Sequence, residues 1–378
     1  MNNPPDIKEF TDKALKEQAD KLDIPFAMDF AGGLAVSLKP LWQSLGKLEN
    51  SFLEDSLSDI PLTNSVYVSG IARSGTTIIL ESLFQSNEFA AHRYRDYPFI
   101  DIPHFWRKWT SLFAKVEEPA QRAHLDRLEI TTQSPEALEE MLWMDFFDEL
   151  HKPELNNVLT DAIENTAFET YYSAHIKKLL KNENKSRYLA KGNYNLTRIR
   201  YINKLYPDAK FIIAIRRPEA HIASLLKQHY LFSQIEKKNN RVLKYMNRIG
   251  HYEFGLNFTP VNIGDNSLSQ KIMSLMNNNH ELEALAHYWA MVYEYIYHDI
   301  LNDDAINSSV LLVRYEDLCK APLDSLKNIQ EFCNLSKELN EPQSGISAPS
   351  YYSHGFSSEQ TELIKNVTEK TKFLYYKD

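Results

Sequence analysis

Residues 64–86 carry the spacing in this chain that points most directly to chemistry. An apolar run over 66–68 leads into a turn bounded by Gly70 and Gly75, and a helix is predicted to begin at Thr76. A strand, a glycine-bearing turn and a helix in this order expose unpaired backbone N–H groups at the positive end of the helix dipole. The segment therefore predicts a binding site for phosphate or a similar anion.

The turn resembles a nucleotide-binding P-loop but departs from it at one position. Gly70-x4-Gly75 has the P-loop spacing, in which Lys and then Ser or Thr follow the second glycine. Thr76 and Thr77 stand there instead, so the cation that bridges the β- and γ-phosphates of a triphosphate is missing. A basic side chain, Arg73, lies inside the turn. Taken alone, the pattern also fits an ordinary strand, turn and helix.

A second predicted strand has cations directly at its carboxyl end. Residues 209–215 are apolar and rich in β-branched side chains, which is typical of a buried parallel strand. Arg216 and Arg217 follow, and Pro218 begins a predicted helix whose early turns carry Ser224. Because open α/β sheets bind ligands beyond the carboxyl ends of their strands, we expect Arg216 and Ser224 to face the glycine-bearing turn. The alternative is a solvated charge at a strand end.

The order of these motifs resembles the sulfotransferases that use 3′-phosphoadenosine 5′-phosphosulfate (PAPS) and release 3′,5′-adenosine bisphosphate (PAP). The resemblance rests on SGTT after the first strand and on Arg216-x-Pro with a Ser eight residues after the Arg. In that family the first loop holds the 5′-phosphosulfate, and the Arg and Ser hold the 3′-phosphate. The cofactor-binding residues that it implies here are Arg73, Ser74, Gly75, Thr76, Thr77, Arg216, Ser224 and Tyr315.

Three of the matched positions have specific implied roles. Arg73 takes the place of the basic residue that neutralises the bridging oxygen as the sulfuryl group leaves; Arg at this position resembles the Golgi-type and bacterial members. Tyr315, in the segment LLVRYEDL, aligns with a residue that borders the nucleotide in some members. Lys191, at the end of a short strand predicted over 187–191, resembles the family's Lys turn and is expected to contact the sulfuryl group or the bridging oxygen. The resemblance spans roughly residues 64–335.

Transfer to an acceptor hydroxyl also requires a general base within hydrogen-bond distance of it. The segment HRYRDYPF, residues 92–99, follows the first predicted helix where related enzymes place a carboxylate or a His. We predict Asp96 as the base, with His92 as the alternative. A competing interpretation is that Asp96 forms an ion pair with Arg93 or Arg95.

Two other functions are compatible with a fold of this kind. A P-loop kinase of small molecules is disfavoured by Thr76 and by the predicted strand 309–314, which ends in an arginine rather than a carboxylate. A non-catalytic nucleotide-binding descendant stays open because the segment 350–358 lacks the C-terminal cations of many relatives. Either Ser353 and His354 replace those cations, or fewer charges hold the 3′-phosphate.

Composition narrows the class of protein without identifying it. The chain has 378 residues, of which 43% are hydrophobic, enough for a large core. A net charge of −9 argues against a general nucleic-acid binder, which needs clustered cations. Cys319 and Cys333 are too few for a disulfide framework and are expected to be buried thiols. No spacing demands a metal, and we expect none in the reaction.

We therefore expect an α/β fold with three layers, in which helices flank a mainly parallel sheet as in P-loop NTPase-like sulfotransferases. A single domain over 1–378 would have its core at about 64–335 and a helical insertion at 97–186. In that insertion Ser134 is expected to cap a helix. The polar, Asn-rich stretch 231–280 predicts a mobile insertion, the usual place for a lid over an acceptor.

The first thirty residues carry charges throughout and no apolar signal region, and no stretch reaches the ~18 apolar residues that span a bilayer. The simplest expectation is a cytoplasmic enzyme of a prokaryote. The acceptor is expected to be a hydroxyl or an amine of a small molecule, a lipid or a carbohydrate. No motif in the insertions distinguishes among these acceptors, and none indicates the oligomeric state.

Overall fold

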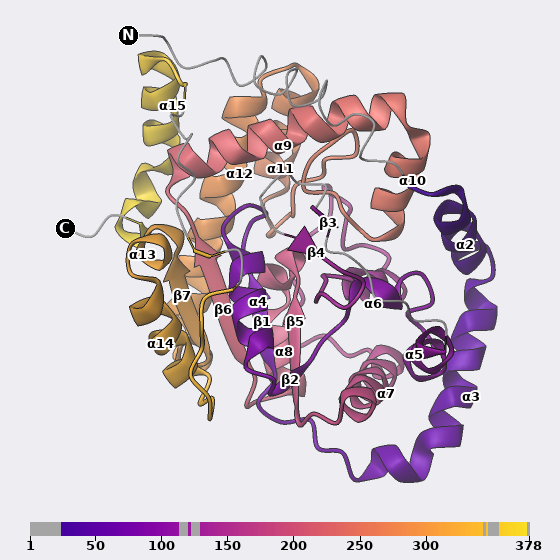
Figure 1. Ribbon diagram of the computed structural model, residues 1–378. Helices are drawn as coiled ribbons and strands as arrows, with labels where there is room; N and C mark the ends of the chain where they lie inside the picture. Colours follow the sequence, from indigo (N-terminus) through magenta and orange to yellow (C-terminus); the bar gives the residue numbers. More distant parts are fainter. Residues whose placement is uncertain (1–23, 113–119, 122–128, 343–344, 347–354, 376–378) are drawn as a thin grey trace.

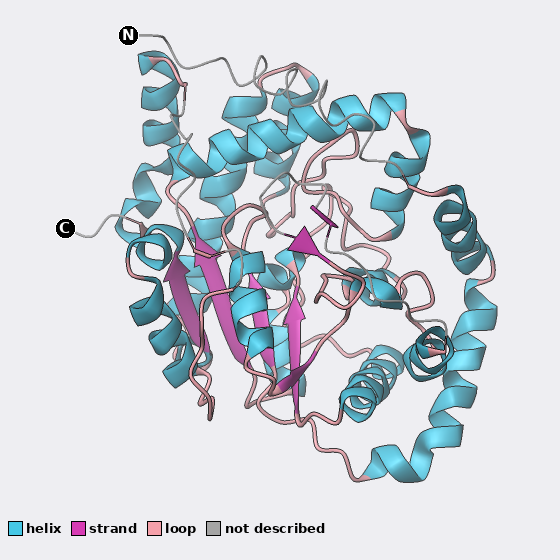
Figure 2. Cartoon of the chain, viewed as in Figure 1, coloured by secondary structure: helices cyan, strands magenta, loops and turns pink. Residues whose placement is uncertain are grey.

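The computed structural model describes residues 24–112, 120–121, 129–342, 345–346 and 355–375. A five-stranded sheet in the order β2-β5-β1-β6-β7 forms its centre, and every pair of neighbouring strands is parallel (Figures 1 and 2). The strands of this sheet are β1 (Val66–Ser69), β2 (Phe89–Ala90), β5 (Arg187–Lys191), β6 (Lys210–Ile215) and β7 (Val310–Arg314). A separate antiparallel ladder pairs β3 (Ala120–Gln121) with β4 (Glu129–Ile130).

Helices cover both faces of the sheet and extend well beyond its edge (Figure 1). The described α-helices are α2 (Phe26–Ser37), α3 (Lys39–Ser58), α4 (Thr76–Gln85), α5 (Pro103–Ser111), α6 (Glu140–Met144), α7 (Thr166–Glu183), α8 (Ile199–Leu205), α9 (Pro218–Lys238), α10 (Asn240–Arg248), α11 (Asn266–Asn277), α12 (Glu281–Tyr295), α13 (Tyr315–Lys320), α14 (Pro322–Phe332) and α15 (Ser358–Thr368). Short 3-10 or π turns are η1 (Tyr94–Asp96), η2 (Asn193–Thr197), η3 (Ile296–Leu301), η4 (Asn307–Ser309) and η5 (Glu369–Leu374).

Successive side chains of β1 point to opposite faces of the sheet, so they pack against the helices of the two outer layers. Val66 and Val68 belong to a buried cluster that includes side chains of α4 and α14. Tyr67, between them, belongs to the larger cluster that includes side chains of α7 and α12. All three residues are fully buried. The expected three-layer architecture with a parallel sheet is thus confirmed.

The predicted strands and the helices that follow the first and the third of them are also present. The runs expected at 66–68, 187–191, 209–215 and 309–314 are β1, β5, β6 and β7. α4 begins at Thr76, and α9 begins at a proline in its first turn, as the sequence predicts. Because β1 pairs with both β5 and β6, the carboxyl ends of three strands lie side by side.

The prediction that Ser134 caps a helix was wrong. The backbone carbonyl of Ser134 accepts a hydrogen bond from the N–H of Tyr94, and Pro135 forms an isolated bridge with Arg93. These contacts hold the segment extended beside η1, and helix α6 begins only at Glu140. A long-range backbone pairing therefore overrides a local capping signal here.

The stretch 231–280, for which the sequence predicts a mobile insertion, has helices of its own, and its mobility stays a prediction. This segment contains the end of α9, all of α10 and all of α11. Val242 of α10 and Ile272 of α11 are fully buried, and the connecting loop buries Phe254. Apolar side chains spaced widely among the asparagines thus anchor two helices to the core.

Among the described residues, none of the helices combines the length and the apolar character needed to cross a membrane. Cys333 is buried and Cys319 is half-buried. Ser353 and His354, considered above as replacements for missing cations, lie outside the described residues.

Candidate functional site

The glycine loop, residues 70–75, joins β1 to α4 in a conformation that requires its glycines. Gly75 has a φ of 104°, and a Cβ atom there would lie 2.7 Å from Cδ2 of Tyr315. A Cβ atom at Gly70 would lie 2.6 Å from the carbonyl oxygen of Ala214. The loop therefore passes close to the ends of both β6 and β7, and any side chain at these positions would push it away.

The glycine loop also delivers backbone N–H groups to this place. Gly75 occupies the N-cap position of α4, and a glycine has no side chain that could cap the helix. Arg73 adopts a φ of 73°, in the left-handed region, which turns the chain sharply before the helix. Thr76 and Ser74 are buried on either side of Gly75. The first turn of α4 thus has the geometry of an anion-binding helix N-terminus.

Arg216, directly after β6, lies against this loop. Its guanidinium carbon is 4.7 Å from the centre of the Tyr315 ring, and its Nη1 donates to the backbone oxygen of Arg73 at 3.4 Å. The side chain is only 5% exposed, so its position is set by packing. The glycine loop follows β1, Arg216 follows β6 and Tyr315 follows β7. Arg216 and Tyr315 lie about 140 and 240 residues after the start of the loop, yet all three meet at one place.

His221 of α9 fixes the glycine loop to the second strand–helix unit. Its Nδ1 accepts a hydrogen bond from Nε1 of Trp289 at 3.1 Å, so its Nε2 carries the proton and donates to the carbonyl oxygen of Ala72 at 2.8 Å. Burial, with Arg216 and Arg73 nearby, lowers the pKa of His221 to about 3, which keeps the ring neutral. No pattern in the sequence assigns His221 a role, and only its contact with the carbonyl oxygen of Ala72 reveals one.

Ser224 lies on α9 three residues after His221 and is 4% exposed. It thus belongs to the same buried turn of the helix that begins at the tip of β6. The residues that the sequence assigned to the two ends of the nucleotide are therefore found on adjoining elements around the glycine loop.

Lys191 ends β5 on the other side of β1. It is paired in register with Val68, and just beyond it the carbonyl oxygen of Gly192 accepts a hydrogen bond from Oγ of Ser69 at 2.7 Å. Ser69 is the last residue before the glycine loop. Lys191 therefore lies one strand away from that loop, at the same edge of the sheet.

A carboxylate near Lys191 was missed by sequence reasoning. Oε1 of Glu253 accepts a hydrogen bond from Nδ2 of Asn193 at 2.6 Å, and its Oε2 lies 2.9 Å from Nδ1 of His251. Although burial raises the pKa of Glu253, the contacts with His251 and Asn193 and the charge of Lys191 lower it to about 2. The group comes from the segment expected to be a mobile insertion, so no local pattern marked it.

Asp96 lies in a different environment, fully buried in a network of ion pairs. Its Oδ1 accepts from Nε of Arg107 at 2.7 Å, and its Oδ2 accepts from Nη2 of the same side chain at 2.5 Å and from the backbone N–H of Arg93 at 2.8 Å. Glu183 of α7 binds Nη1 of Arg107 at 2.6 Å and also the side chain of Arg93. Burial favours the neutral acid, but Arg107 and His92 hold the pKa of Asp96 well below its usual range.

This geometry favours a structural ion pair for Asp96, although with a partner that sequence reasoning did not name. His92 is 2% exposed; its Nδ1 lies 3.8 Å from Oδ2 of Asp96, and its Nε2 lies 3.3 Å from Nε2 of His175. The rings of His92 and His175 stack at 5.0 Å. The catalytic role of either residue stays a prediction.

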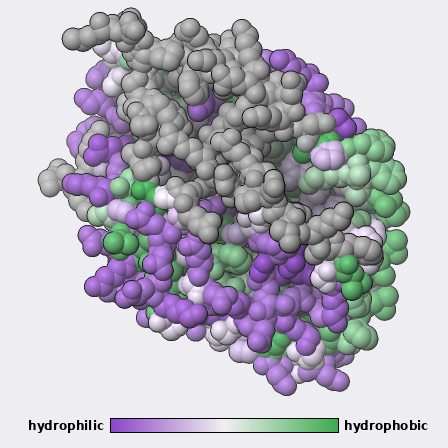
Figure 3. All heavy atoms as spheres, viewed as in Figure 1, coloured by the Kyte–Doolittle hydropathy of each residue, from purple (hydrophilic) through white to green (hydrophobic). Residues whose placement is uncertain are grey.

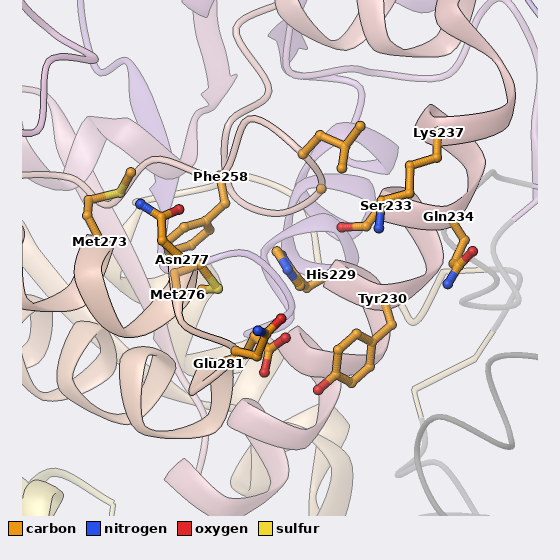
Figure 4. Close-up of a pocket in the computed structure, with 13 residues that line it drawn as sticks. His229, Tyr230, Ser233, Gln234, Lys237, Phe258, Met273, Met276, Asn277 and Glu281 are labelled. Carbon is orange, nitrogen blue, oxygen red and sulfur yellow. The ribbon is translucent and has the colours of Figure 1, made fainter.

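A cavity of about 450 Å³ lies within the part of the molecule formed by residues 229–281 (Figure 4). It is lined by His229 and Ser233 of α9, by Phe258 and by Glu281 at the start of α12, among others. Ser233 follows Ser224 by nine residues, or about two and a half helical turns, so the two serines lie on opposite faces of α9. The cavity is therefore separate from the strand tips.

Among the residues that the structure describes, no group of three or more His, Cys, Asp or Glu side chains could hold a metal ion.

Comparisons with known proteins identify the family. A model of the sulfotransferase family matches residues 65–253, half of the chain, and this match covers the glycine loop, Lys191, Arg216 and Ser224. A comparison with curated proteins gave no significant match.

Solved structures with a similar chain path include three bacterial proteins. Sulfotransferase STF9 from Mycobacterium avium has 14% identity and a TM-score of 0.46, over 100% of this chain and 93% of that chain. Sulfotransferase STF1 from Mycobacterium tuberculosis H37Rv has 15% identity and a TM-score of 0.42, over 98% and 100% of the two chains. The sulfotransferase domain of the Synechococcus PCC 7002 olefin synthase has 14% identity and a TM-score of 0.35, over 85% and 98%.

The chain belongs to the sulfotransferase family and is an enzyme of sulfuryl transfer.

Proposed function

We propose that this sulfotransferase takes its sulfuryl group from PAPS and leaves PAP. In this proposal the glycine loop with Thr76 and Thr77 holds the 5′-phosphosulfate, and Arg216 with Ser224 holds the 3′-phosphate. The observation that carries it is the contact of 3.4 Å between Nη1 of Arg216 and the backbone oxygen of Arg73. One nucleotide with anionic groups at both ends could reach both of these strand tips.

The chemistry follows from where negative charge develops. Sulfuryl transfer moves a charged group between two oxygens in line, so catalysis consists mainly of positioning and of stabilising charge on the leaving phosphate. The N–H groups at the start of α4 and the Arg73 guanidinium would stabilise that charge. Lys191, one strand away, would contact the sulfuryl group from the opposite side. Tyr315, which lies under Arg216, would border the nucleotide.

Activation of the acceptor needs a base, which we propose to be in the segment that holds His92 and Asp96. Of the two, His92 is the better candidate, because the oxygens of Asp96 already accept three hydrogen bonds from Arg107 and Arg93. Asp96 would then orient the His92 ring, and its negative charge would stabilise the ring when it takes up a proton. Oδ2 of Asp96 lies 3.8 Å from Nδ1 of His92. The acceptor would be a hydroxyl or an amine of a small molecule, a lipid or a carbohydrate.

Two measurements test this function. Calorimetric titration should give binding of PAP and much weaker binding of ATP, because Thr76 replaces the P-loop Lys that contacts a triphosphate. Incubation with PAPS labelled in its sulfuryl group should transfer label to members of an acceptor library, detected by the mass shift of one sulfuryl group. Tighter binding of ATP than of PAP would contradict the proposed donor, and binding of PAP without any transfer would indicate a non-catalytic descendant.

A further inference from the structure

Large apolar side chains are exposed on three helices at one side of the molecule. Phe52 of α3 is 74% exposed, Leu48 of the same helix is 62% exposed, and Leu112, just after α5, is 78% exposed. Phe26 and Phe30 of α2 are also exposed. Figure 3 shows hydrophobic residues gathered along the side of the molecule where Figure 1 places α2 and the adjoining part of α3.

The spacing of these side chains on α3 is that of a helix prepared to pair with another helix. Leu41, Leu45, Leu48 and Phe52 follow one another at intervals of four, three and four residues, the spacing of the a and d positions of a coiled coil. The residues that α3 buries against its own domain lie on another face and include Leu53 and Leu57, among others. The exposed seam is therefore additional to the face that the fold itself uses.

A second seam of the same kind lies beside the first. Phe105, Trp109 and Leu112 are spaced by four and then three residues along α5 and its C-cap, and all three are exposed. The rings of Phe52 and Phe105 lie 5.8 Å apart, so the seams of α3 and α5 join into one surface. Phe26 and Phe30 stack on each other at 6.2 Å in the helix that leads into α3.

The size of this surface fits a protein interface better than a monomer's surface. An aromatic side chain presents roughly 150–250 Å² when fully exposed, so the exposed fractions of its five aromatic residues correspond to roughly 450–750 Å² in total. The exposed leucines add to this area. The largest apolar patch of a typical monomer is about 300–600 Å², whereas one side of a standard interface buries about 800 Å².

The charges near the surface favour a protein partner over a membrane. Residues 24–60, which include α2 and α3, contain five acidic and two basic residues. Helix α5 adds Lys108 and Arg107, of which Arg107 is buried and paired with Asp96. Membrane-surface helices instead carry Lys and Arg that attract anionic lipids.

Ser44 and Ser51 flank the central part of the α3 seam, and the exposed Asp55 lies three residues beyond Phe52, at the end of the seam. Two antiparallel copies related by a twofold axis near Leu48 would place Asp55 opposite the Leu41 end of the partner's seam rather than opposite a second Asp55.

We propose that this apolar surface is the interface of a homodimer, in which the α3 seam of one chain packs on the α3 seam of its copy. A self-complementary apolar stripe satisfies the requirement of a twofold interface, because each residue then meets a residue of the same surface. Leu48 and Phe52 would be its central contacts. This inference does not depend on the identity of the donor or the acceptor, since the surface shares no residue with the strand tips.

Sedimentation velocity and light scattering of the full chain test the proposal over roughly 1 to 100 µM protein. The expected mass is twice the 43.9 kDa of one chain. Leu48→Asp should raise the dimer dissociation constant at least about a hundredfold, because it buries an unpaired charge at the centre of the interface. Phe52→Asp should do the same, and both variants should keep the wild-type circular dichroism, because both side chains are exposed within one chain.

Leu323→Asp is the matched control. Leu323 of α14 is 64% exposed, against 62% for Leu48, but it lies outside the proposed interface, so its variant should remain dimeric. A monomeric wild-type chain at the highest concentration would overturn the proposal, as would a dimer that Leu48→Asp and Phe52→Asp leave intact. Co-sedimentation of a monomeric wild-type chain with phosphatidylserine vesicles would overturn it in favour of a membrane surface. PAP binding measured on the same samples reports separately on the proposed function.

Discussion

The strand tips and the Asp96 network both hold buried arginines, but they use them in opposite ways. At the strand tips Arg216 lies against the backbone of the loop that carries Arg73, so two cations are brought to one place. In the other region Arg107 binds the carboxylates of both Asp96 and Glu183. The first arrangement gathers positive charge where an anion could bind, whereas the second neutralises its charges internally.

The difference shows how a candidate base can be misjudged from sequence. A carboxylate in a polar loop near a predicted site fits catalysis, and Asp96 satisfied that description. The structure surrounds it with three donors, and burial of a paired carboxylate is typical of a structural role. The distinction lies in the partners of the charge rather than in its type or its position in the sequence.

The contrast between the two regions would fail most clearly if Arg73 were dispensable for sulfuryl transfer. Arg73→Ala should reduce sulfuryl transfer by at least about 100-fold to 1,000-fold, the range for losing one group that stabilises charge in a transition state. The melting temperature should stay unchanged, because Arg73 is partly exposed and lies in a loop. Turnover with labelled PAPS is the measurement. Arg73→Lys, which keeps the charge, should retain part of the activity, and wild-type turnover in Arg73→Ala would remove its assigned role.

Asp96→Asn tests the other region. Removing this charge leaves Arg107 partly unpaired in a buried position, so the free energy of unfolding should fall by about 3–5 kcal/mol in chemical denaturation. Asp317→Asn is the control: Asp317 is 45% exposed and lies 3.9 Å from Arg314, so its loss should change stability by less than about 1 kcal/mol. If Asp96→Asn lost turnover but kept full stability, Asp96 would return as the base.

Arg216→Ala sharpens the assignment of the 3′-phosphate. Binding of PAP should weaken by about 1.5–3 kcal/mol, the value of a hydrogen bond to a charged group. Arg217→Ala removes the same charge from the next residue, which is exposed, and should have a much smaller effect. The PAP dissociation constants of both variants, measured by calorimetry, separate a specific contact of Arg216 from the non-specific attraction of two neighbouring positive charges. Equal dissociation constants in the two variants would show that the 3′-phosphate binds elsewhere.

The last prediction concerns pH and a second carboxylate whose charge is neutralised inside the fold. Glu140 is bound by Arg198 at 2.6 and 2.8 Å and by His151 at 2.7 Å. Burial raises the pKa of Glu140, but Arg198 and His151 lower it to about 2. Because its usual value is about 4.5, Glu140 stabilises the fold above that pH. This contribution is lost as the pH falls toward 2.

The free energy of unfolding should therefore decline between about pH 5 and pH 2, with up to about 1.4 kcal/mol per pH unit from this one group. Urea denaturation across this range is the measurement. Glu140→Gln should be less stable at neutral pH and should show a shallower decline. A decline of the same slope in Glu140→Gln would show that other carboxylates cause it.

Local pattern was sufficient for the sheet and the glycine loop. Each parallel strand of four or more residues contains an unbroken run of at least three apolar residues, and Gly70 and Gly75 have the spacing of an anion-binding turn. These features are patterns among residues that are neighbours in sequence, so they can be predicted without an alignment. The reason that Gly70 and Gly75 exclude a side chain lies instead in the distant residues Ala214 and Tyr315. The same is true of Arg216, because its place at a strand end decides which edge of the sheet it reaches.

Contacts between distant residues decided the rest. The two strand–turn–helix units with their anion loop and arginine can be predicted from the residues alone, because backbone geometry and apolar periodicity are local properties. Three features arise only when the chain packs: Arg107 and Glu183 enclose Asp96, Glu253 approaches Lys191, and α3 leaves an apolar seam exposed. These outcomes depend on which surfaces pack together, and burial and charge pairing are properties of the packed chain rather than of any segment of it.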